Sequence, residues 1–273
     1  MKTETKKYRD QTNALLEEMS PVNKEYFDKL YGYVLLATFL KDEASIGEQI
    51  YNMAVDLRDA EQDGLTAEEF FGKDAKGMAD AIIANTPKIH WRELTSLVLL
   101  IGSVLGYYRL LQDFSSASRL PLNVLPYLSD VVLGSLAVYL IFQCISRIIY
   151  SRRTWFWSGL IGLIAVVTFF LMKSAKEWLS AGWGLVLPAP WDIALVFAVS
   201  LIYLVWSLRD RTFWCFIFPI AAFLLVGILR RLLDGVEPSN DFLHTWLPIG
   251  IIGLGLILFY WQLFRQSKKL KQK

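Results

Sequence analysis

Cysteine and histidine are both scarce in this chain of 273 residues, which contains two of each. Cys144 and Cys215 lie inside apolar runs, so we expect two small buried side chains and not a disulfide framework. The sequence shows no Cys/His cluster with metal-ligand spacing, and residues 1–89 contain neither residue type. It therefore predicts no metal centre and no cofactor.

Other features of function are missing as well. The N-terminal stretch MKTETKKYRDQ lacks the apolar core of a signal peptide, so we expect the start of the chain to stay in the cytoplasm. The first 93 residues contain no paired acid and base and no glycine-rich phosphate loop. No ionisable residue falls at the centre of a long apolar run, where proton-coupled transporters and intramembrane proteases usually carry one. These absences argue against an enzyme.

Charge divides the chain into two parts. Residues 1–93, called the head below, contain 12 Lys/Arg and 18 Asp/Glu, whereas residues 94–273 contain 16 and 8. A head with a formal charge of −6 does not suit nucleic acid, which binds concentrated basic surfaces. The second part is strongly apolar, and the whole chain reaches 54% hydrophobic residues and a mean hydropathy of +0.37.

Six apolar stretches reach or approach the roughly 20 residues that span a bilayer. They are 94–111, 126–150, 155–172, 191–208, 213–229 and 247–264, and the basic tail 265–273 follows. If the head is cytoplasmic, the cytoplasmic flanks hold 12 Lys/Arg and the opposite flanks hold 6. The sequence thus predicts a multi-pass protein of the plasma membrane with both termini in the cytoplasm.

The polar groups of the membrane part have structural explanations. Arg109, Asp130, Asp192 and Arg209 fall near span ends, where snorkelling or capping can satisfy them. The segment Lys173 to Trp191 could lie flat on the outer leaflet. Small residues allow membrane helices to pack closely. We expect such packing at Gly102 and Gly106 in the first span and at Gly250, Gly253 and Gly255 in the sixth. We expect it within the bundle in preference to a homo-oligomer.

The head shows helical periodicity. Ser20 and Pro21 begin a helix that reaches Phe39, and a second runs from Glu43 to Gln62 before Gly64. Thr66 and Glu69 form a capping box, Phe70 and Phe71 supply core, and a last helix ends before Pro87. Residues 6–19 are expected to form a frayed leading helix. We therefore predict an all-α fold, with a helical bundle whose ordered core covers about residues 20–86 and about six transmembrane helices.

Residues Tyr26–Pro87, and DGLTAEEFFG (Asp63 to Gly72) above all, resemble the family catalogued as domain of unknown function 1129. Its members are membrane proteins of Gram-positive bacteria that combine a cytoplasmic helical module with several spans. The matching positions are Gly64, Thr66, Ala67, Phe71 and Gly72. The resemblance implies the same architecture, and it supplies no catalytic residues.

The leading hypothesis is a non-enzymatic regulatory, sensing or scaffolding protein whose head binds a cytoplasmic partner protein while the spans lie in the lipid bilayer. The candidate partner-binding residues, mainly structural, are Gly64, Thr66, Glu69, Phe71 and Gly72. A transporter or transporter subunit is the first alternative. A membrane enzyme acting on lipid is the second, and a candidate outer-loop site for it, or for a cation or headgroup, is Asp234, Glu237, Asp241 and His244.

Overall fold

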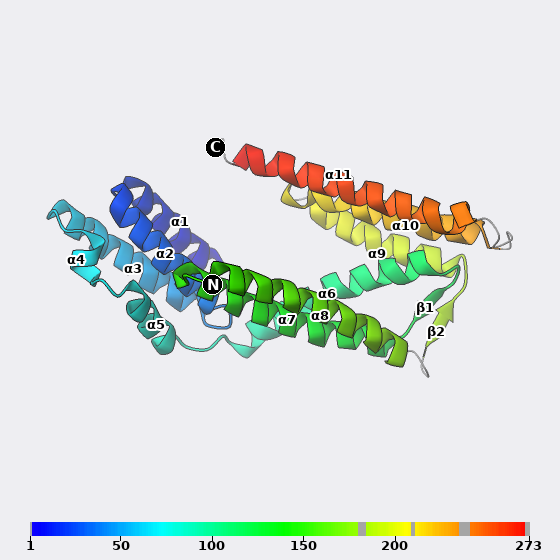
Figure 1. Cartoon of the computed structure of the whole chain (residues 1–273), viewed down its shortest axis with the longest axis horizontal. Coiled ribbons are helices and arrows are strands. Elements are labelled where there is room, and N and C mark those ends of the chain that lie inside the picture. The colour runs from blue at the N-terminus through cyan, green and yellow to red at the C-terminus, as the bar shows by residue number, and fades with distance from the viewer. Residues whose placement is uncertain (1, 180–183, 209–210, 235–240, 271–273) are drawn as a thin grey trace. The chain divides into compact units, whose positions relative to one another are not determined.

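The computed structural model describes residues 2–179, 184–208, 211–234 and 241–270. The chain forms two compact units, one of residues 1–101 and 132–171 and the other of residues 102–131 and 172–273. The first contains the head. Helices dominate both (Figure 1).

Five helices make up the head: α1 (Lys2–Glu18), α2 (Pro21–Ala37), α3 (Glu43–Gln62), α4 (Ala67–Phe71) and α5 (Ala75–Asn85). Their apolar stripes meet in one core around Phe27, Leu30, Ile50 and Leu57, each at most 1% exposed. The periodic pattern of the sequence therefore predicted α2, α3 and the capped start of α4 correctly.

The leading helix differs from its prediction. It is not frayed, because Thr12, Leu16 and Met19 are buried and the ring of Tyr8 lies 5.7 Å from that of Tyr51 in α3. The core thus includes residues well before position 20. Most residues of this helix are polar, and this hid the few apolar side chains that it buries.

Side-chain caps fix where the head helices begin. Asp42 accepts a hydrogen bond from the amide of Ala44 at the start of α3, and Asp74 accepts one from Gly77 in α5. Ser20 occupies the N-cap of α2 but its hydroxyl makes no capping bond; instead its backbone N–H donates to Glu61 at 2.8 Å. Each bond satisfies an amide that the helix leaves unpaired.

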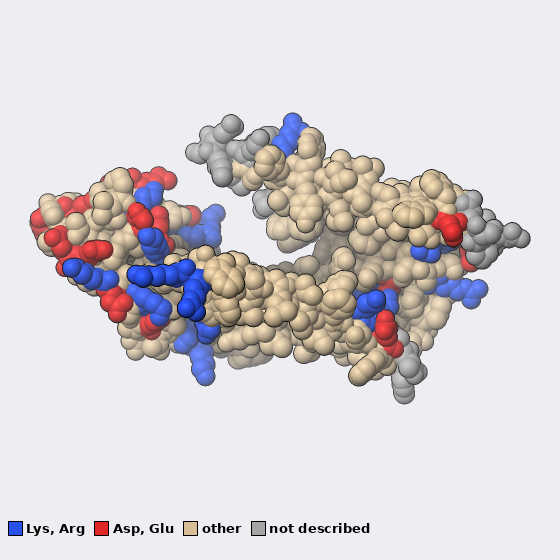
Figure 2. All heavy atoms as spheres, in the orientation of Figure 1, with Lys and Arg blue, Asp and Glu red and all other residues tan. Residues whose placement is uncertain are grey.

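Within the described residues, six helices are long and apolar enough to cross a membrane, at Trp91–Ser116, Val124–Tyr150, Thr154–Leu179, Trp191–Leu208, Phe213–Leu232 and Phe242–Ser267. They contain α6 (Trp91–Ser116), α7 (Val124–Tyr150), α8 (Thr154–Leu179), α9 (Trp191–Leu208), α10 (Ile217–Leu232) and α11 (Leu247–Leu270), with a 3-10 turn (Arg211–Phe216) before α10 and a π turn (Phe242–Trp246) before α11. The protein is an all-α polytopic membrane protein, as predicted. The visible surface of these helices carries few charges along most of their length (Figure 2).

A short β-ribbon joins the ends of α6 and α9. Strand β1 (Leu120–Leu122) pairs antiparallel with β2 (Leu185–Leu187), with Leu120 opposite Leu187. The prediction of a flat interfacial segment between Lys173 and Trp191 was therefore wrong: α8 continues to Leu179, and part of the remainder forms β2. We call the helix ends that adjoin this ribbon the ribbon end.

The glycine predictions are confirmed in part. A Cβ at Gly102 would lie 3.1 Å from Val131 on α7, and one at Gly106 would lie 3.8 Å from Tyr127, so this face of α6 packs as expected. Gly250 and Gly253 do not pack on a neighbouring helix as predicted, because a Cβ at either would have no neighbour within 4 Å among the described residues. On α11 the packed position is Gly255, whose Cβ would come 2.6 Å from that of Ala222 on α10.

Candidate interaction site on the N-terminal bundle

The DGLTAEEFFG stretch forms a rigid corner between α3 and α5. Gly64 and Gly72 adopt φ values of +82° and +90°, which side chains disfavour, so glycine is needed on both sides of α4. Thr66 and Glu69 form the predicted capping box: the Glu69 amide donates to the Thr66 hydroxyl at 3.3 Å, and the Thr66 amide donates to the Glu69 carboxylate at 2.8 Å. Hydrogen bonds from Thr66 also hold the pKa of Glu69 below its usual value.

Side chains of α2 fasten this corner to the bundle. Asn23 is buried; its carbonyl oxygen accepts from the Ala67 amide at 2.7 Å and its amide donates to the Leu65 carbonyl at 3.5 Å. The Tyr26 hydroxyl donates to the Gly72 carbonyl at 2.9 Å, and its ring stacks on Phe71. Of the motif residues, Phe71 thus serves the core, and the corner keeps one geometry.

Three apolar side chains stay exposed around the corner: Val22, Leu65 and Phe70, at 67%, 42% and 44%. We call them the corner patch. They lie on the segments that Asn23 joins, at the start of α2 and on either side of Ala67. Phe70 is thus not part of the core, contrary to the prediction from the sequence. Exposed apolar side chains on segments that Asn23 joins make this corner the candidate interaction surface of the head.

The opposite end of α2 packs on the last turns of α7. Tyr33 and Tyr150 meet edge to face with 5.1 Å between ring centroids, and Phe39 stacks on Phe142 at 4.1 Å. A Cβ at Gly32 would lie 3.6 Å from Ile149, so the backbone of α2 approaches α7 closely here. Because aromatic pairs have preferred geometries, these contacts fix the head to one membrane helix. We call them the joint.

A polar group steadies the joint from the side of α5. The Tyr33 hydroxyl donates to Asp80 at 2.7 Å, and Lys76 pairs with the same carboxylate at 2.9 Å. Burial, followed by the Asp80 carboxylate, raises the pKa of Tyr33 to about 12. Hydrogen bonds from Lys76 and then Tyr33 lower the pKa of Asp80. Tyr33 therefore keeps its proton, and with it this bond, at every physiological pH.

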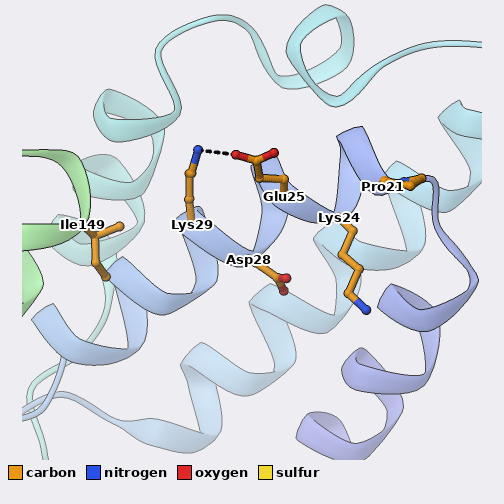
Figure 3. A pocket seen from close by; sticks show the side chains of 6 residues that line it. All are labelled: Pro21, Lys24, Glu25, Asp28, Lys29 and Ile149. Atoms are coloured by element: carbon orange, nitrogen blue, oxygen red, sulfur yellow. Dashed lines mark hydrogen bonds and ion pairs between the residues drawn. The ribbon is translucent and has the colours of Figure 1, made fainter. Parts of the chain in front are cut away.

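A surface pocket of about 490 Å³ extends along α2 between these two features (Figure 3). It is lined by Pro21, Lys24, Glu25, Asp28, Lys29 and Ile149. Five of these belong to α2, and Ile149 belongs to α7. A group bound in this pocket would therefore touch the head and a membrane helix at once.

A set of ion pairs that the sequence did not reveal lies at the ribbon end, and all its members except Lys176 are buried. Arg109 on α6 pairs with Asp130 on α7 at 2.7 Å, and Asp113 on α6 pairs with Lys176 on α8 at 2.5 Å. Tyr127 donates to Asp113 at 3.3 Å. We expected Arg109 and Asp130 to snorkel to water, but each is 4% exposed, so they pair with each other inside the protein. Among the described residues, Arg109 Nη2 and Asp130 Oδ1 are buried without a hydrogen-bond partner.

A second pair joins α9 and α10. Asp192, which is fully buried, accepts from Arg231 at 2.7 Å and pairs with a second guanidinium nitrogen at 2.6 Å. Arg231 also donates to the carbonyls of Phe114 and Gly227, and its guanidinium lies 3.7 Å from the centre of the Phe114 ring. Asp192 was expected to cap a helix or to reach water, but it forms an ion pair with Arg231. The spacing of charges along one span could not reveal this pair, because the two residues are 39 positions apart.

The candidate outer-loop site is only partly described. Asp234 and Asp241 are exposed, His244 is half-buried, and Glu237 lies outside the described residues. Over the described part of the chain, no group of three or more His, Cys, Asp or Glu side chains could hold a metal ion. Arg209, the fourth charged residue expected near a span end, also lies outside that part.

Comparisons of the chain with protein-family models, with curated proteins and with solved structures found no match. The resemblance of Tyr26–Pro87 to domain of unknown function 1129 therefore stays a prediction.

Proposed function

We propose that this chain is a non-enzymatic regulatory membrane protein whose head binds a partner protein in the cytoplasm and transmits the bound state to α7. The main support for this proposal is the joint between α2 and α7. Tyr33–Tyr150 and Phe39–Phe142 make α2 and the end of α7 one packed element. A partner that shifts α2 must therefore shift α7 or break these contacts, and packed elements respond as units.

Two features support a role in binding. The corner patch lies outside the buried apolar core of the head, and, among the described residues, only Phe70 within it has a ring contact, edge to face with Phe71. The head also lacks cysteine, and its first histidine is His90, at the start of the first span. Several of its carboxylates serve as caps or form exposed ion pairs, as Glu69 and Glu25 illustrate. This arrangement favours recognition over catalysis.

Partner binding can be tested by scanning the head with a photoreactive amino acid in membranes of the source cells. Positions would cover exposed sites on α1, α2, α3 and α4 of the full chain. We expect one discrete protein adduct that forms from a contiguous surface and is lost when the core variant Leu57→Asp unfolds the head. Absence of an adduct at every position would overturn the proposal.

Transmission to α7 needs its own measurement. In the full chain, hydrogen exchange of residues 142–150 should accelerate when Leu57→Asp disrupts the head, because the joint then loses its support. The exposed substitution Glu48→Gln on α3 is the matched control and should leave this exchange unchanged. If α7 exchanges at the same rate with an intact and a disrupted head, the head does not communicate through the joint.

A transporter or transporter subunit is the second candidate, favoured by the ion pairs of the ribbon end. Ionisable residues buried between membrane helices often line ion or proton pathways. Here Arg109, Asp113, Asp130 and Lys176 come together from three helices. Currents recorded from proteoliposomes under proton and sodium gradients test it: currents that Asp130→Asn abolishes would favour transport, and silent proteoliposomes would not.

A further inference from the structure

The corner patch has a specific chemical setting. Between residues 56 and 74 the chain has seven Asp/Glu and two Lys/Arg, so this stretch contributes most of the head's formal charge of −6. Acidic side chains gather over this end of the bundle in Figure 2. Burial raises the pKa of Tyr26, beside the corner, and Glu68 and Asp74 raise it further, as concentrated negative charge would. A surface of this kind attracts cationic ligands and repels anionic ones.

The backbone that carries the corner patch is held in one conformation by bonds within the head itself. Positive φ at Gly64 and Gly72, the capping box and the two bonds of Asn23 hold Leu65 and Phe70 in place. A preordered surface loses little conformational entropy on binding, which increases affinity. The corner is therefore better suited to docking than Leu35, which is equally exposed at 44% but stands alone near the other end of α2.

We propose that the corner patch, Val22, Leu65 and Phe70, binds a basic amphipathic segment of a partner protein. The apolar stripe of such a segment covers the patch, and its Lys and Arg side chains meet the acidic rim formed by Asp63, Glu68 and Glu69. A membrane surface is a poorer occupant, because anionic lipids would be repelled by the same rim. The inference rests on the proposed function, and it adds the surface and the chemistry of the partner.

The experiment places the photoreactive residue at position 65 or 70 of the full chain in source-cell membranes, with position 35 as the matched control. We expect adducts at 65 and 70 in at least about fivefold higher yield than at 35, as for a binding difference of about 1 kcal/mol. Mass spectrometry of the cross-linked peptide should identify a segment with more Lys/Arg than Asp/Glu and with apolar residues at helical spacing.

A charge reversal tests the acidic rim separately. Glu68→Lys should reduce the adduct at position 70 by about fivefold or more, because it places a repulsive charge beside the patch. Glu48→Lys, on an exposed face of α3, changes the net charge equally and should leave the yield unchanged. Equal effects of the two variants would show that the rim does not select the partner.

The remaining outcomes are decisive as well. Adducts to lipid, to an acidic or uncharged segment, or to residues 265–273 of this chain would overturn the inference, the last in favour of the chain's own basic tail. Adducts at other head positions but not at 65 or 70 would overturn the corner as the site and leave the proposed function standing. No adduct anywhere on the head would overturn both.

Discussion

The ring of Tyr33 in α2 meets the ring of Tyr150 at the end of α7 with an interplanar angle of 76°. This edge-to-face contact joins a helix of the head to a helix that is long and apolar enough to cross a membrane. Tyr33 belongs to the apolar core of the head and Tyr150 packs against that core, so the pair connects the core to α7.

Weakening the Tyr33–Tyr150 pair should loosen the joint. We expect Tyr150→Ala to lower the free energy of local opening at the end of α7 by about 1–3 kcal/mol, and the double-mutant cycle with Tyr33→Ala to give a coupling of about 0.5–1.5 kcal/mol. Hydrogen exchange of residues 142–150 measures both. Strict additivity of the two substitutions would show that the rings do not interact.

Alkaline pH should reduce the contribution of Tyr33 to the stability of the head. The pKa of Tyr33 is raised from 10.0 to about 12, so its proton stays bound in the folded state where the unfolded chain would lose it. Its contribution to stability is full below pH 10 and is lost as the pH rises toward 12. The ultraviolet titration of the wild type minus that of Tyr33→Phe should show one phenol with a midpoint near 12; a midpoint near 10 would contradict the buried environment.

The capping box should matter for the corner. Thr66→Ala removes the acceptor for the Glu69 amide and should destabilise α4 locally by about 1 kcal/mol, whereas Thr66→Ser keeps the hydroxyl and should cost only a few tenths. Hydrogen exchange of residues 66–72 distinguishes the two variants. Identical exchange in both would mean that the bonds from Asn23 and Tyr26 hold the corner without the cap.

Two glycines on α11 provide a matched test of helix packing. Gly255→Ala puts a methyl group 2.6 Å from Ala222 and 3.2 Å from the Phe218 carbonyl, so α10 and α11 must separate, and we expect a loss of about 1–3 kcal/mol. Gly253→Ala fills open space and should be neutral or slightly stabilising, because alanine favours helix. Unfolding in detergent measures both, and equal effects would contradict this packing.

The buried ion pair Arg231–Asp192 should contribute far more to the stability of the fold than an exposed ion pair does. Removing one partner, as in Arg231→Met, leaves the other charge buried and should cost about 3–5 kcal/mol. Lys29→Met breaks the exposed pair with Glu25 and should change stability by less than about 1 kcal/mol. The same unfolding assay compares them, and similar losses would show that water reaches Asp192.

Local signals predicted the head well because each acts over a few residues. The Thr66–Glu69 box, Pro21 at the start of α2 and Gly64 after α3 are read directly from spacing, and each is where it was expected. Apolar length predicted the six spans for the same reason. The fourth span, 191–208, lies where it was predicted, whereas the other five helices continue past the predicted apolar runs at one end or both.

Pairings between distant segments could not be read in this way. Arg109 and Asp130 each lie near a helix end, a position that also suits snorkelling, and only the fold brings them to 2.7 Å. Which of Gly250, Gly253 and Gly255 packs against α10 depends on the face of α11 that meets α10. The sequence of α11 alone does not specify that face. The corner patch was hidden because Phe70 and Phe71 look alike in sequence, although one is exposed and the other supports the core.

The bonds of Arg231 impose an order on biosynthesis. The carbonyl of Phe114 lies in the last turn of α6, where it has no intrahelical donor, and Arg231, which donates to it, is made 117 residues later. The ion pairs of Arg109 and Asp113 with α7 and α8 can form earlier, because both partners precede α10 in the chain. The last turn of α6 thus completes its bonds only after α10 has been made.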